Sequence, residues 1–185
     1  MTGPIRSLAA FVGLAALACA LTACDGSSVG GTPAPATSSS SAPSSSAGQS
    51  NTPLAGLSPC KTLDQALAGQ GYPAATPDIA DPEHVCDAQK PGQDDYLGLG
   101  LQDGQRYDTS ISNPEKTQKG NVRDRRAILE PEPNHGSGIC AVSIEVKPES
   151  RAIVSASLAS GTTDQACTAA ENLAAAVELL LPKTN

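Results

Sequence analysis

The cysteines offer the widest choice of chemistry in this sequence, because a thiol can be acylated, oxidised to a disulfide or bound to a metal. The chain of 185 residues contains six of them. Two belong to the N-terminal region, which leaves an even set of four that predicts two disulfides in an exported domain. Four cysteines allow three connectivities. The four are Cys60, Cys86, Cys140 and Cys167.

Local sequence patterns favour one of the three connectivities. Residues 139–146 alternate in polarity, which places Cys140 on the inward face of a predicted strand. Cys167 lies in an apolar stripe at helical spacing in the segment that follows. Because both side chains point into the same core, we expect a Cys140–Cys167 disulfide and, by elimination, a Cys60–Cys86 disulfide.

The two histidines would be needed for a metal site. His84 closely precedes Cys86, and His135 closely precedes Cys140, so these residues could together form a His2Cys2 cluster. Zinc sites usually take their ligands in close pairs such as Cys-x-x-Cys or His-x3-His, and neither spacing occurs here. We therefore expect no metal and no cofactor.

Acid–base catalysis would depend on the same two histidines. Gly136-Ser137-Gly138 does not form the Gly-x-Ser-x-Gly turn of a serine nucleophile. A loose acidic cluster lacks the Asp-x-Asp-x-Asp-Gly spacing of a calcium loop, and such clusters are usually solvated loops. We expect no catalytic residues. The acidic cluster consists of Asp78, Asp81, Glu83 and Asp87.

One basic stretch opposes the overall charge of the chain. With 12 Lys and Arg against 19 Asp and Glu, the net charge is −7, which argues against a nucleic-acid partner. Aromatic residues make up only 2% of the chain, which argues against a stacking surface for bases or sugars. The basic stretch indicates an anion-binding patch for a lipid headgroup, a phosphorylated glycolipid or an acidic protein surface. The simpler interpretation, which we favour, is an exposed loop kept soluble by charge. The stretch contains Lys116, Lys119, Arg123, Arg125 and Arg126.

The N-terminal region indicates the compartment. An apolar run from Leu8 to Leu21 suits a signal peptide and is shorter than the roughly 20 residues that span a bilayer. It ends in Leu21-Thr22-Ala23-Cys24, which resembles the bacterial lipobox, although Thr22-Ala23 also fits an ordinary secretory cleavage site. The small residues admit a peptidase before Cys24, whose sulfur takes up a diacylglyceryl group. Because two acyl chains on one sulfur anchor a protein stably, whereas one chain would be marginal, we expect the mature protein on the extracytoplasmic face of the cell membrane.

Composition then divides the chain into three parts. We expect a signal peptide over residues 1–23 and a lipid-anchored, flexible Ser/Pro-rich linker over residues 24–56. The linker is too poor in large apolar residues to offset its ordering entropy. Residues 57–185 are expected to form a single globular domain, which is long enough for one hydrophobic core.

The elements expected in this domain give an α+β fold. Ser58-Pro59 starts a helix, and a capping box of Thr162 and Gln165 starts another that Pro182 limits. Asn113-Pro114 would start a short third helix. The fold class is a small antiparallel sheet covered by an N-terminal and a C-terminal helix and stapled by two disulfides. Predicted strands are residues 84–88, 96–101 and 126–130, with a hairpin of 139–146 and 152–158.

These features together resemble a known family. They are lipobox Cys24, the Ser/Pro-rich tether, Ser58-Pro59-Cys60 opening a helix, Cys86, Cys140 at a strand, and Cys167 in an Ala-rich helix ending in Leu181-Pro182. The chain resembles the actinobacterial lipoproteins of the uncharacterised family called domain of unknown function 3558. The resemblance implies an envelope lipoprotein with an α+β domain, and it transfers no activity.

Two classes of function remain open at this point. We expect a non-enzymatic domain that binds a ligand or partner in the cell envelope: a protein, a lipid or a glycolipid. The alternative is an envelope hydrolase whose site combines His84, His135 and the acidic cluster. An apolar cavity lined by Leu and Val would favour binding, whereas a cleft joining a histidine to a nucleophile and an acid would favour catalysis.

Overall fold

The structure is a computed structural model that describes residues 52–183. The predicted signal peptide, Cys24 and most of the predicted linker lie outside the described residues. The elements, in chain order, are α1 (Pro59–Ala66), β1 (Thr76–Pro77), β2 (Val85–Gln89), β3 (Tyr96–Asp103), β4 (Gln118–Val122), β5 (Arg125–Pro131), the 3-10 helix η1 (Pro133–His135), β6 (Ile139–Lys147), β7 (Ser150–Ser157) and α2 (Thr163–Glu178).

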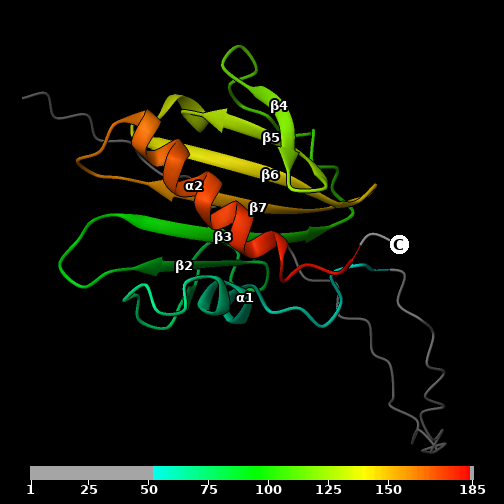
Figure 1. Ribbon diagram of the computed structural model, residues 1–185, viewed down its shortest axis with the longest axis horizontal. Coiled ribbons are helices and arrows are strands. Elements are labelled where there is room, and N and C mark those ends of the chain that lie inside the picture. Colours follow the sequence, from blue (N-terminus) through cyan, green and yellow to red (C-terminus); the bar gives the residue numbers. More distant parts are fainter. Residues whose placement is uncertain (1–51, 184–185) are drawn as a thin grey trace, which may run out of the picture. The chain divides into compact units, whose positions relative to one another are not determined.

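The seven strands form one antiparallel sheet in the order β1-β2-β3-β7-β6-β5-β4 (Figure 1). Strands β1 to β3 make one meander and β4 to β7 make a second, and the pairing of β3 with β7 joins the two. An antiparallel sheet with two α-helices and two disulfides agrees with the predicted class. Neither helix in residues 52–183 combines the length and apolar composition needed to cross a bilayer.

The hairpin of β6 and β7 forms the centre of the hydrophobic core, and its prediction is confirmed. Alternate residues of β6 are buried, because successive side chains of a strand point to opposite faces. Ala152, Val154 and Ala156 bury the same face of β7. The buried residues of β6 are Cys140, Val142, Ile144 and Val146.

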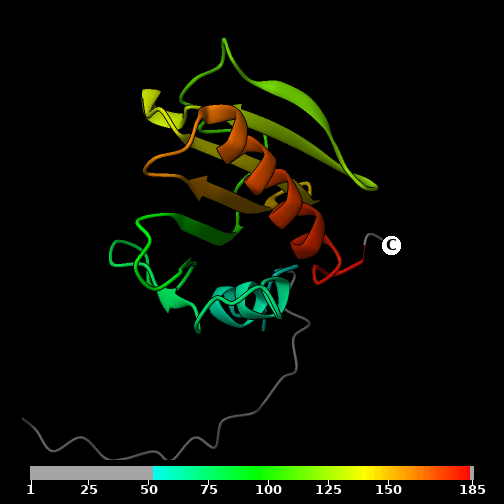
Figure 2. The same cartoon turned by 60° about the vertical axis from the view of Figure 1, so that its left-hand side comes forward.

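Helix α2 packs on β6 and β7, and Figure 2 shows it lying across one face of the sheet. The predicted capping box is present: the Thr162 hydroxyl accepts from the Gln165 N–H, and the Gln165 side chain accepts from the Thr162 N–H. Both hydrogen bonds satisfy N–H groups that a helix start leaves unpaired. The buried face of α2 consists mostly of small residues: Ala166, Ala170, Leu173, Ala174 and Val177.

Helix α1 begins where the sequence predicts. Ser58 is its N-cap and Pro59 occupies the first turn, where the missing proline N–H costs nothing. Leu63 is fully buried against the sheet. Leu54 is also buried in the core, so at least this residue of the predicted linker, before the predicted boundary at residue 57, belongs to the fold.

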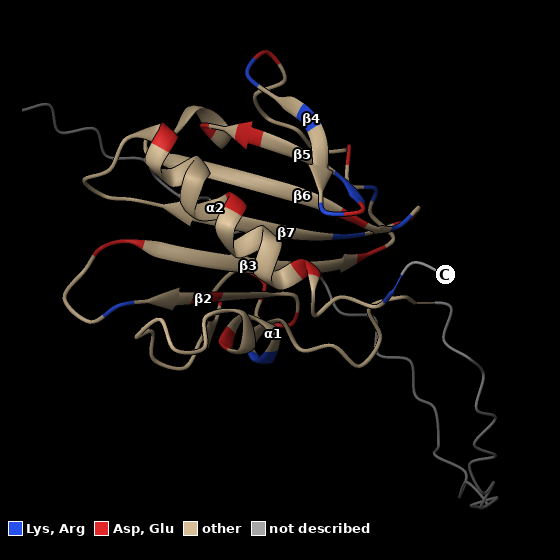
Figure 3. Cartoon of the chain, in the orientation of Figure 1, with Lys and Arg blue, Asp and Glu red and all other residues tan. Residues whose placement is uncertain are grey.

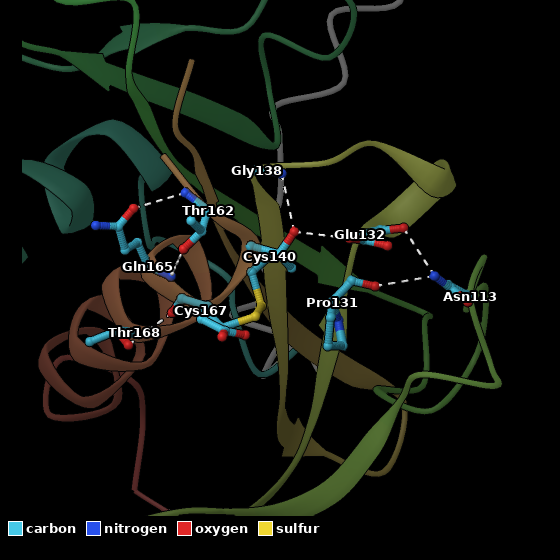
Figure 4. Close-up of a disulfide and its surroundings, with 11 residues drawn as sticks. Asn113, Pro131, Glu132, Gly138, Cys140, Thr162, Gln165, Cys167 and Thr168 are labelled. Carbon is cyan, nitrogen blue, oxygen red and sulfur yellow. Dashed lines mark hydrogen bonds between the residues drawn. A yellow bond between two sulfur atoms is a disulfide. The ribbon is translucent and has the colours of Figure 1, made fainter. Parts of the chain in front are cut away.

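The predicted disulfide connectivity is confirmed. Cys60 of α1 bonds to Cys86 of β2, and Cys140 of β6 bonds to Cys167 of α2. Figure 4 shows the second bond crossing from the strand to the helix beside the Thr162 capping box. Each disulfide therefore ties one helix to one strand of the sheet.

One local prediction is wrong, and the elements β1, β4 and η1 were not predicted. Asn113-Pro114 starts a turn and no helix, because the Asn113 side chain donates to the carbonyls of Pro131 and Glu132 and holds the chain against β5 (Figure 4). Strand β4 was not predicted, since it is polar and exposed and carries no alternating apolar pattern. It forms through backbone pairing with β5.

Candidate functional site

A hollow of about 310 Å³ lies between α2 and the edge strand β4, and we call it the α2–β4 groove. Its floor is apolar and comes from three adjacent strands, β4, β5 and β6. Residues of α2 form the opposite wall. The floor residues are Val122, Ala127, Leu129 and Val142, and the wall residues are Glu171 and Ala175.

Small residues leave this space open. Gly120 of β4 lies opposite Ala127 of β5 in the strand register, so both face the groove. A Cβ atom added at Gly120 would meet no atom within 4 Å. Across the groove, the side chain of Ala175 is a single methyl group. The hollow thus exists because three facing positions of β4, β5 and α2 lack large side chains.

Polar residues of mixed charge border the groove. Gln118 of β4 is exposed and Glu171 of α2 is acidic. Arg123 follows β4 in a left-handed conformation with φ 52°. Its side chain donates to the Ala175 carbonyl at 3.3 Å and lies 3.7 Å from the Glu178 carboxylate. An apolar floor with a polar border is the usual form of a ligand site.

The structure divides the predicted basic patch instead of presenting it as one surface. Arg125 is 4% exposed, so its assignment to an accessible patch or an exposed loop is wrong. Its guanidinium donates to Glu178 at 3.0 Å, to the Val146 carbonyl at 3.2 Å and to the Pro182 carbonyl. These acceptors satisfy a charge that would otherwise be costly to bury. Arg125 is therefore a structural residue.

The other basic residues are on the surface, and two of them are neutralised by acidic neighbours. Arg126 makes two hydrogen bonds with Glu145, at 2.6 and 2.5 Å, and stacks over Tyr107. Lys116 pairs with Glu132. Of the other two, Arg123 lies beside the α2–β4 groove and near Glu178, whereas the Lys119 side chain points to the opposite face of β4. Figure 3 shows blue and red segments mixed around β4 and the turn that follows it.

The histidines of the hydrolase alternative are not brought together. His84 directly precedes β2, whereas His135 ends η1, between β5 and β6. Strands β3 and β7 lie between β2 and β6 in the sheet, so the two histidines are separated by several interstrand spacings of about 4.8 Å. The His84 ring hydrogen-bonds to Asp81 at 2.8 Å, and this contact raises the pKa of His84.

Part of the acidic cluster does assemble. Asp78 accepts from the N–H groups of Ala80 and Asp81, and these bonds lower the pKa of Asp78. Asp87 of β2 lies beside it, and burial together with the Asp78 charge raises the pKa of Asp87. Gly98 makes room for Asp87, because a Cβ there would lie 2.8 Å from the carboxylate. Glu83 is exposed and takes no part in this pair.

The two cysteines of the suggested His2Cys2 cluster are bonded to other cysteines: Cys86 to Cys60, and Cys140 to Cys167. Within residues 52–183, no three His, Cys, Asp or Glu side chains gather in a way that could hold a metal ion. The chain matches no protein-family model, no curated protein and no solved structure. Its function must therefore be argued from its own geometry.

Proposed function

We propose that this protein is a non-enzymatic binding module of the cell envelope, held at the membrane by a lipid on Cys24. The α2–β4 groove is the binding site for its ligand or partner. The observation that carries the proposal is the apolar floor of Val122, Leu129 and Val142 beneath a polar border.

The volume and the lining of the groove support binding. About 310 Å³ is enough for a small ligand or for one or two side chains of a partner protein. Burying apolar groups of a ligand on the floor would contribute about 25 cal/mol for each Å² removed from water. The groove contains no histidine, so it lacks the usual general base of a hydrolase.

The sequence supports the placement in the envelope. The lipobox ending at Cys24 would fix the chain to the membrane, and the Ser/Pro-rich linker would hold the domain away from the headgroups. The resemblance to the family called domain of unknown function 3558 agrees with this arrangement. We also propose the finer form of the fold class, in which α1 and α2 cover the same face of the sheet.

A matched pair of substitutions in β4 tests the groove. Gly120→Val directs a new side chain into the open space, and Gly120 has no positive φ that would strain the variant. Asn121→Val introduces the same residue at the next position, whose side chain points to the opposite face. Each full-length variant is extracted from its own membrane and weighed by native mass spectrometry.

We expect a co-purifying molecule on the wild type and on Asn121→Val, and its loss from Gly120→Val. Both variants should unfold at the wild-type temperature or slightly above it, because valine suits a strand better than glycine or asparagine. The groove would be refuted as the binding site if the wild-type protein carried no co-purifying molecule, or if the molecule stayed bound to Gly120→Val.

A further inference from the structure

The two edges of the seven-stranded sheet differ in their capacity to accept another strand. At one edge, β1 consists of only Thr76 and Pro77, and proline has no N–H to donate to a neighbouring strand. At the other edge, β4 runs for five residues without a proline and pairs with β5 in a continuous register without a bulge. No other strand of residues 52–183 pairs with the outer side of β4 (Figure 1). An edge of this kind is a template for pairing with another chain.

The side chains of β4 leave this outer edge accessible. The first four residues of the strand are exposed, and Val122 is half-buried. Gln118, Gly120 and Val122 share the face of the α2–β4 groove, whereas Lys119 and Asn121 share the opposite face. A strand added at this edge would therefore extend the floor of the groove on one face and meet Lys119 and Asn121 on the other.

A second copy of β4 fits this edge in an antiparallel register centred on Gly120. A twofold axis between two identical antiparallel strands stands perpendicular to the sheet and sets one residue opposite its own copy. With Gly120 at the axis, Lys119 lies opposite Asn121 of the second copy, and Gln118 lies opposite its Val122. All five residues of β4 are then paired. No charged residue of the strand faces a like charge.

The neighbouring registers fit less well. An axis at Lys119 or at Asn121 would pair only three of the five residues of β4, and the first of these would also place Lys119 against its own copy. A lysine on an edge strand usually opposes pairing, but here it selects one register. In that register the exposed residues Lys116 and Asp124 follow opposite each other, so opposite charges approach at both ends of the paired strands.

We propose that two copies of this protein associate through their β4 strands into a symmetric dimer with one continuous sheet. Because the axis is perpendicular to the sheet, both α2 helices lie on the same face, and the two α2–β4 grooves meet across the paired strands. Five-residue strands give a small interface, so the dimer is weak in dilute solution. The proposed membrane anchor would raise the effective concentration of the copies. The pairing requires no ligand in the groove, so it stands or falls separately from the proposed function.

Disulfide crosslinking tests the position of the axis. Gly120→Cys sets the new thiol opposite its own copy, with Cβ atoms about 5 Å apart, which is close to the span of a disulfide. Gly120 has no positive φ that would strain this variant. Asn121→Cys is the matched control, because its two copies are diagonal neighbours with Cα atoms about 7–8 Å apart, too far for a disulfide.

Both full-length variants are oxidised in their own membrane and separated on a non-reducing gel. We expect at least about ten times more covalent dimer from Gly120→Cys than from Asn121→Cys. Absence of a covalent dimer of Gly120→Cys, or equal crosslinking of the two variants, would overturn the proposal. A product whose mass is not twice that of the chain would also overturn it, and would assign the edge to a different protein.

A charge exchange tests the contact between Lys119 and Asn121 of the two copies. Asn121→Lys sets lysines opposite each other twice in a symmetric dimer, whereas Asn121→Glu sets a carboxylate opposite each Lys119. We expect the dimer dissociation constant of the full-length protein in detergent, measured by sedimentation, to rise about fivefold in the first variant and to fall about fivefold in the second.

A second substitution controls for effects within one chain. Asn121 also lies opposite Arg126 of its own chain, so Lys119→Glu is added to Asn121→Lys, which leaves that neighbour unchanged and restores opposite charges between the copies. The double variant should dimerise at least as tightly as the wild type. Thermal unfolding verifies that each variant is folded. A dissociation constant that is the same in all of these proteins would overturn the proposed register and, with it, the dimer.

Discussion

Arg125 illustrates how much of the behaviour of a charged residue is decided by its surroundings. In sequence it stands between Asp124 and Arg126 in a stretch that appears exposed and basic. In the structure it is the residue of that stretch that the core encloses, and Glu178 and two backbone carbonyls satisfy its donors. It ties β5 to the end of α2 and to the segment beyond it.

Replacing Arg125 by Ala should destabilise the protein by about 3–5 kcal/mol, because Glu178 would remain mostly buried without its closest cationic partner. Arg126→Ala is the control: its side chain is 64% exposed, and the loss of such an ion pair should cost at most about 1 kcal/mol. Urea denaturation of both variants measures the difference. Equal losses would contradict a structural role for Arg125.

The raised pKa of Asp87 predicts how the stability of the protein depends on pH. Its pKa is raised in the fold, chiefly by burial, so folding favours the protonated carboxyl. The contribution of Asp87 to stability is therefore fully present below the pKa of the unfolded chain and is lost as pH rises through the folded pKa. The Asp87→Asn variant has a side chain of nearly the same shape that is uncharged at every pH.

We therefore expect Asp87→Asn to be more stable than the wild type at pH 7 and equally stable in acid. Asp78, whose pKa is lowered, loses its stabilising contribution on acidification in both proteins, so it largely cancels in the comparison. Thermal unfolding across the pH range measures this difference. A gain for Asp87→Asn that persists unchanged in acid would exclude the titration of Asp87 as its cause.

At the scale of elements, the disulfides compensate for small core residues. The buried face of α2 consists mostly of alanine, which contributes less apolar area than leucine would. The Cys140–Cys167 bond closes a loop with a sequence separation of 27, for which the chain-entropy model gives about 3.5 kcal/mol.

Replacing both Cys140 and Cys167 by Ala should lower the free energy of unfolding by about 3.5 kcal/mol in urea. The matched variant, Cys60→Ala with Cys86→Ala, opens a loop of nearly equal separation, 26, and should lose a similar amount. A loss below about 1 kcal/mol in either variant would mean that the bond adds little to the core.

The elements that could be predicted are those with their own local pattern. The β6–β7 hairpin alternates in polarity, and α2 has both a capping box and an apolar stripe. These two patterns also gave the correct cysteine pairing. Strand β4 has no such pattern, because an exposed edge strand needs backbone pairing and no buried face.

The α2–β4 groove could not be predicted from the sequence. Its walls lie at residues 118–129 and 171–175, and only the packing of α2 over the sheet brings them together. The groove is open because Gly120 and Ala175 have no large side chains. Small residues at two distant positions form no recognisable sequence pattern. Lys119 and Arg123 were singled out correctly as surface cations, but their neighbours were not foreseen.

At the scale of the whole molecule, the proposed anchor makes the simplest prediction. Cys24→Ala should abolish labelling by radioactive palmitate and should leave the protein unprocessed, because the thiol that takes up the lipid is gone. Cys19→Ala is the control and should be labelled as the wild type is, since Cys19 lies within the predicted signal peptide. Labelling of Cys24→Ala would show that the lipid is on another residue.

The covalent topology of the chain follows from the two disulfides and the two meanders. Cys60–Cys86 lies wholly within the α1–β3 part, and Cys140–Cys167 lies wholly within the β4–α2 part. No disulfide of the described residues crosses the β3–β7 seam, where backbone pairs from Tyr96–Ser157 to Asp103–Ser150 hold the parts together. In the oxidised, unfolded chain the two disulfides therefore close two separate loops that share no residues. Forming either disulfide places no constraint on the other.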